Sequence, residues 1–150
     1  MSLKDQLVED MKAAMKDKEA GKLRLSVIRM VRAAIKNAEI DKKKEFNDEE
    51  VIEVLVREAK QRRDAIEEYR KAGREDIVEQ LQEEIKVLLH YLPEQMSAEE
   101  ITALVHEIIT RVGARDQKDM GKVMGALMPK VKGRADGKLV NQIVKEALGG

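Results

Sequence analysis

The residues best suited to chemistry are five basic side chains near the end of the chain. They fall within 17 residues and are Lys122, Lys130, Lys132, Arg134 and Lys138. Lysine and arginine bind phosphate groups without reading a base sequence, so their natural ligand is a nucleic-acid backbone. The alternative is a basic edge that keeps the protein soluble. The set is therefore a candidate phosphate-binding site.

Glycines lie among these basic residues at Gly121, Gly125 and Gly133. Two glycines inside one helix cost about 1 kcal/mol each relative to alanine, and we expect a close approach to the backbone to offset that cost. A neighbouring helix is the favoured occupant, and a ligand is the alternative. Three methionines recur every four residues through the same helix: Met120, Met124 and Met128. This spacing is typical of a core stripe, or of an adaptable binding surface.

Other reactive groups are few. The chain has no cysteine, which excludes a disulfide framework and thiolate catalysis. Ser2 and Ser97 are interpreted as helix caps, and His90 and His106 have no ligand partner at metal-binding spacing. No glycine-rich phosphate loop and no nucleophile-elbow motif is present. We therefore expect no catalytic residue, no metal site and no cofactor.

Composition indicates long exposed helices. Of 150 residues, 43% are apolar and 39% are charged. The net charge is zero but uneven: +5 over residues 1–44, −9 over residues 45–100 and +4 over residues 101–150. Basic ends around an acidic middle favour a polyanionic partner. The start lacks a signal-peptide core, and no run reaches the roughly 20 apolar residues of a membrane span, so we expect a cytoplasmic protein without a membrane partner.

Apolar periodicity predicts seven helices and no strand, and hence a multihelical all-α fold. The expected helices begin near Ser2, Lys22, Asn47, Arg74, Ser97, Lys118 and Asp136. Pro93 cannot continue a helix, so we expect a four-helix part over 1–92 and a three-helix part over 93–150.

Local signals also predict the helix ends and the inward faces. Ser2 is expected to cap the first helix, while Asn47 and Ser97, each three residues before a glutamate, predict capping boxes. The stripes of the first two helices are expected to include Met15 and Met30.

A family resemblance rests on these same residues. The matching segments are Arg29-Met30-Val31-Arg32-Ala33-Ala34-Ile35, Leu92-Pro93-Glu94-Gln95, Gly113-Ala114, Asp119-Met120-Gly121-Lys122-Val123-Met124-Gly125, Pro129-Lys130-Val131-Lys132-Gly133-Arg134-Ala135-Asp136-Gly137 and Val140-Asn141. Together they resemble the YqeY family over the whole chain. The family is similar to the tail of the GatB subunit of the glutamine-dependent tRNA amidotransferase, which helps to hold tRNA and does not carry out the chemistry. The resemblance implies a small bacterial all-α protein.

Three functions follow from the resemblance. The first is non-catalytic binding of RNA, and of tRNA above all, in which the five basic residues contact phosphates and Gly121, Gly125 and Gly133 permit close approach. The second is a protein-interaction module for an amidotransferase or synthetase subunit, which would use the methionine helix or the hairpin around Ala72-Gly73. The third is carbon–nitrogen ligase activity with glutamine as amide donor, within a complex. Glutaminase chemistry needs an activated nucleophile, which argues against the third.

Overall fold

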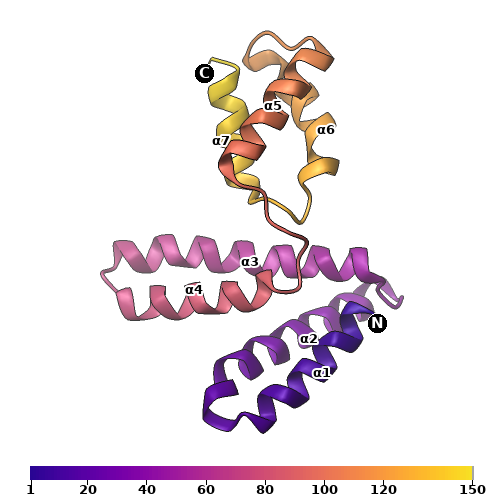
Figure 1. The fold of residues 1–150 in the computed structure, drawn as a ribbon, viewed down its shortest axis with the longest axis vertical. Helices are drawn as coiled ribbons and strands as arrows, with labels where there is room; N and C mark the ends of the chain where they lie inside the picture. The colour runs from indigo at the N-terminus through magenta and orange to yellow at the C-terminus, as the bar shows by residue number, and fades with distance from the viewer. Residues whose placement is uncertain (150) are drawn as a thin grey trace. The chain divides into compact units, whose positions relative to one another are not determined.

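The computed structural model describes residues 1–149, in which it has seven α-helices and no strand. The predicted all-α fold is confirmed. The chain divides into two compact units, one over Met1–Leu92 and one that begins at Pro93. Figure 1 labels their helices. No helix of residues 1–149 has the length and apolarity that a membrane span requires.

Unit 1 contains two helical hairpins. The first consists of α1 (Leu3–Lys16) and α2 (Lys22–Lys42), joined through a short 3₁₀ turn. At that turn a side chain on Gly21 would meet the carbonyl oxygen of Ala14 at 2.1 Å, so the close approach requires glycine. The second consists of α3 (Asp48–Lys71) and α4 (Glu75–Leu89), which turn at Gly73 with φ of +74°. Both turns therefore depend on the missing side chain.

The predicted caps are confirmed. The Ser2 side chain accepts a hydrogen bond from the backbone N–H of Asp5 at the start of α1. Asn47 and Glu50 form a full capping box at α3. Ser97 forms another with Glu100 at the start of α5 (Ala98–Val112). These bonds satisfy backbone donors that have no partner inside a helix.

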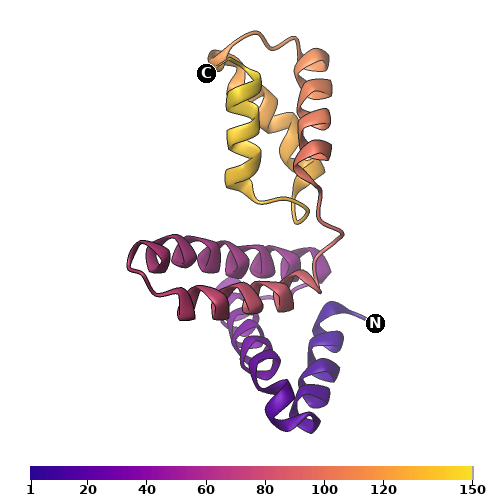
Figure 2. The ribbon, with the colours of Figure 1, turned by 60° about the vertical axis from the view of Figure 1, so that its left-hand side comes forward.

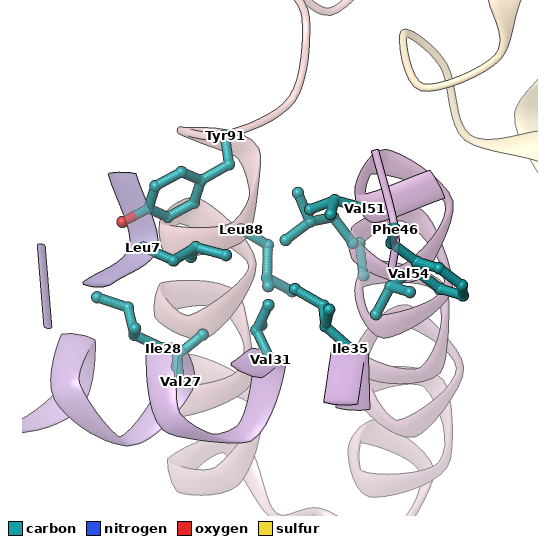
Figure 3. Close-up of a cluster of buried hydrophobic side chains, with 12 residues drawn as sticks. Leu7, Val27, Ile28, Val31, Ile35, Phe46, Val51, Val54, Leu88 and Tyr91 are labelled. Atoms are coloured by element: carbon teal, nitrogen blue, oxygen red, sulfur yellow. The ribbon is translucent and has the colours of Figure 1, made fainter. Parts of the chain in front are cut away.

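The core of unit 1 lies where α1, α2, α3 and α4 meet, and Figure 3 shows its side chains pointing toward one another. Ile28, which the predicted stripe of α2 left out, is 1% exposed. Met15 and Met30, which were expected to face inward, are instead about half exposed, at 50% and 51%. Because α2 packs against α1 on one side and against α3 and α4 on the other, its buried stripe centres on Val31 and takes in Ile28.

Two polar contacts join the helices of unit 1. The hydroxyl of the buried Tyr91 donates to Asp10 at 2.5 Å, and burial together with this bond raises the pKa of Tyr91 above its usual value. The Arg62 guanidinium is only 5% exposed. It pairs with Glu84 of α4 at 2.9 Å and with Glu58 of α3 at 3.3 Å. One buried cation thus bridges two mostly buried carboxylates on facing helices.

We expect Arg62→Ala to lower the free energy of unfolding of unit 1 by about 3–5 kcal/mol, because Glu58 and Glu84 would keep their charges without a cation. Urea denaturation of the full chain measures the change. Arg57→Ala removes an exposed cation from the same helix and should shift stability by no more than about 0.5 kcal/mol. Equal small effects of both substitutions would contradict a structural role for the Arg62 ion pairs.

Candidate nucleic-acid interface

Unit 2 is a three-helix bundle made of α5, α6 (Met120–Val131) and α7 (Gly137–Ala147). Figure 2 shows the α6–α7 loop at one end of this bundle and the α5–α6 connection at the other. Each helix contributes residues with no exposed surface to one core, such as Ile108, Leu127 and Val144. The bundle fixes which residues meet at each end.

The α6–α7 loop is tied to the segment that precedes α5. Gln95 Nε2 donates to the carbonyl of Gly133 at 2.8 Å, and the backbone N–H of Met96 donates to the carbonyl of Arg134 at 2.8 Å. In return Arg134 Nε donates to the carbonyl of Glu94 at 3.0 Å. Gly133 has φ of +77°, which glycine adopts without strain. The loop is therefore held from two sides of the chain.

Four of the five predicted basic residues gather at this end of unit 2. Lys130 lies in the last turn of α6, Lys132 and Arg134 lie in the loop, and Lys138 lies in the first turn of α7. The three lysines are exposed, whereas Arg134 is half-buried. Asp136 caps α7 by accepting from the N–H of Lys138 at 3.2 Å. The arrangement places exposed ammonium groups around an anchored loop.

Lys122 does not join this group. It lies in the first turn of α6, eight residues before Lys130, which is about 12 Å along a helix. Arg134 also has a structural role that the sequence did not reveal, since part of its guanidinium is used on the Glu94 carbonyl. The exposed phosphate-binding candidates at the loop are therefore Lys130, Lys132 and Lys138.

The predicted helix crossing at Gly121 and Gly125 is wrong. A side chain built on either glycine would meet no atom of residues 1–149 within 4 Å. Val123, Leu127 and Val131 form the buried stripe of α6, and the glycines lie on the opposite, exposed face. The alternative, that a molecule outside this chain approaches the backbone here, stays a prediction.

The methionine stripe divides between core and surface. Met120 and Met124 pack against the core of unit 2, and Met128 is 38% exposed. Successive methionines are 40° apart around a helix, so the third has turned past the buried face. Met128 therefore lies next to the glycine face.

Pro129 adds a feature that helix prediction missed. It lies inside the last turn of α6, where proline has no N–H to give to the carbonyl four residues earlier. That carbonyl belongs to Gly125, on the exposed face. The outer face of α6 thus combines missing side chains with a backbone acceptor that lacks its helical donor. A proline four residues after a glycine is the signal that could have revealed it.

Few groups suited to catalysis come together elsewhere. No cluster of three or more His, Asp or Glu residues in the described chain could hold a metal ion. A groove of about 610 Å³ in unit 1 contains charged groups that are already paired. Arg24 binds Asp17, Lys86 binds Glu83, and Asp10 accepts from Tyr91. The groove therefore presents polar groups with assigned partners.

Relatives of known name carry the comparison further. Two proteins called altered inheritance of mitochondria protein 41, mitochondrial, are similar to this chain. The protein from Pyrenophora tritici-repentis is 34% identical over 146 residues, which cover 95% of this chain and 79% of the relative. The protein from Kluyveromyces lactis is 44% identical over 108 residues, which cover 69% of this chain and 57% of the relative. Because both names include a mitochondrial location, the expected cytoplasmic location stays a prediction.

A shorter match joins the chain to part of a tRNA enzyme. One of the subunits of the glutamyl-tRNA(Gln) amidotransferase from Methanobrevibacter smithii is 40% identical over 57 residues, which cover 35% of this chain and 9% of that relative. The expected similarity to a tRNA amidotransferase is confirmed for this small part of the enzyme. The family model described as Yqey-like protein matches residues 4–148. The chain therefore belongs to the family of YqeY-like proteins.

Proposed function

We propose that this protein binds RNA, with tRNA as the first candidate, through the α6–α7 end of unit 2 and without carrying out chemistry on it. The observation that carries the proposal is the set of exposed lysines 130, 132 and 138 around a loop held by hydrogen bonds to Glu94, Gln95 and Met96. A fixed loop holds its cations at set distances, which suits a phosphate backbone better than scattered surface lysines do.

The relatives support this choice of partner. The match to the Methanobrevibacter smithii amidotransferase is 57 residues long, about the size of unit 2, and the name of that relative refers to a tRNA enzyme. It covers only 9% of the relative, so the amidotransferase activity as a whole is not carried over. We infer that the shared part serves to hold RNA. Glutamine-dependent ligase activity in a complex is not proposed, because the chain has no cysteine nucleophile.

A protein partner is the second candidate, and the outer face of α6 favours it. Gly121 and Gly125 leave the helix backbone open, and Met128 adds an exposed, adaptable apolar side chain. A helix from an amidotransferase or a synthetase could approach such a face closely. This face and the lysine loop are separate, so the two candidates can be tested separately.

We expect the triple variant Lys130→Gln, Lys132→Gln, Lys138→Gln to bind a labelled tRNA transcript more weakly than the wild type. The slope of log affinity against log salt should fall in magnitude by about 2–3, because three phosphate contacts are lost. Fluorescence anisotropy across a salt series measures both quantities. Arg134 is left unchanged because its side chain supports the loop.

The matched control neutralises three exposed cations at the opposite end of the same unit, namely Arg115, Lys118 and Lys145. The side chain of Gln117 donates to the carbonyl of Lys145 at 2.8 Å, so these residues share one end of the bundle. Both variants change the net charge equally. If they weaken tRNA binding equally, general charge explains the binding and the loop has no special role.

We expect Gly121→Ala with Gly125→Ala to stabilise unit 2 by about 1–2 kcal/mol, because both methyl groups would enter open space on a helix. If a partner helix uses this face, the same variant should lose nuclease-resistant capture of amidotransferase components. Asn141→Ala, on the exposed face of α7, is a control that raises helix propensity elsewhere. A loss of stability in the glycine variant would contradict the open geometry of α6.

A further inference from the structure

The outer face of α2 carries a straight line of cations. Lys22, Arg29 and Lys36 are separated by seven residues each, and all three are exposed. Seven residues turn a helix by 700°, so each cation lies within 20° of the one before it. The line is about 21 Å long at 1.5 Å per residue. It lies on the side of α2 opposite the buried residues Val31 and Ile35.

Small and polar residues separate the cations. Ser26 and Ala33 lie between them on the same face and are exposed. Arg32 flanks the line, is also exposed, and has Met11 as the hydrogen-bond partner of one guanidinium nitrogen. Ile40 is the exposed apolar residue that ends the line. A face with so little apolar surface offers a partner protein little to bury, whereas it is well suited to a charged backbone.

Acids of the chain leave this line uncompensated. Asp41 lies about 100° away around the helix, and Glu39, about 80° away, is already bound to Lys4 at 2.6 Å and to the N–H of Phe46 at 2.7 Å. Those two hydrogen bonds, and the nearby Lys4 and Lys36, lower the pKa of Glu39. No acid of residues 1–149 forms an ion pair within 4 Å of Lys22, Arg29 or Lys36. These charges are therefore available to an anionic partner.

We propose that the outer face of α2 is a second phosphate-binding surface, which contacts the backbone of the same RNA that unit 2 binds. The inference rests on the proposed function and assigns unit 1 a share in it. A regular line of three cations of this length faces several successive phosphates of one strand, since the axial spacing of phosphates along a strand is about 3.4 Å in duplex DNA. The surface contacts phosphates and carries no sequence readout.

The test neutralises the line in the full chain with Lys22→Gln, Arg29→Gln and Lys36→Gln. Glutamine has nearly the same helix propensity as lysine and arginine, so urea denaturation should show unchanged stability. The matched control on α3 is Arg57→Gln, Lys60→Gln and Lys71→Gln, which removes three exposed cations from a helix whose outer face also carries exposed glutamates such as Glu53 and Glu67. Binding of a labelled tRNA transcript is measured by anisotropy from low to high salt.

We expect the α2 variant to lower the magnitude of the salt slope by about 2–3 and the α3 control to change it by less than about 1. An α2 variant that matches the control, while the Lys130, Lys132 and Lys138 variant still loses affinity, would overturn the second surface and leave RNA binding by unit 2 intact. In that case the face would be free for an acidic protein. Absence of tRNA binding by the wild-type protein at low salt would overturn both proposals.

Discussion

The hydrogen bonds between Glu94–Met96 and the loop at Gly133–Arg134 decide where the basic residues of unit 2 lie. They join parts of the chain that are about 40 residues apart. A loop between two helices would otherwise be free to fray, and each freely moving lysine would lose side-chain and backbone entropy on binding a phosphate. Here part of that cost is met during folding, since the carbonyls of Gly133 and Arg134 already have fixed donors. The loop is preorganised by residues that need not touch a ligand.

The two outer faces of α2 and α6 show how a helix can serve a core and a ligand together. Each helix buries one stripe, centred on Val31 in α2 and on Leu127 in α6. The opposite face is then free of packing demands. In α2 that face carries cations with small residues between them, whereas in α6 it carries glycines that lower helix propensity with no gain inside the chain. Residues that cost stability without an internal reason are expected where a partner binds.

Local signals explain why the helices could be predicted so well. Caps at Ser2, Asn47 and Ser97 depend on neighbours three residues away, so the sequence alone determines them. The exposure of Met15 and Met30 could not be read in the same way, because it depends on which helices surround α1 and α2. The Arg62 bridge to Glu84 and the Arg134 bond to Glu94 join residues 22 and 40 positions apart. Periodicity contains no information about such distant pairs.

Charge segregation explains how a chain with no net charge can bind a polyanion. The acidic segment, residues 45–100, contains α3 and α4, where Glu58 and Glu84 are bound to Arg62. The cations of α2 and of the α6–α7 loop lie outside that segment on exposed faces. At physiological salt, charges further apart than about 8 Å are largely screened, so a phosphate at the loop interacts mainly with the lysines beside it. Local arrangement, and not the total charge, therefore governs the attraction.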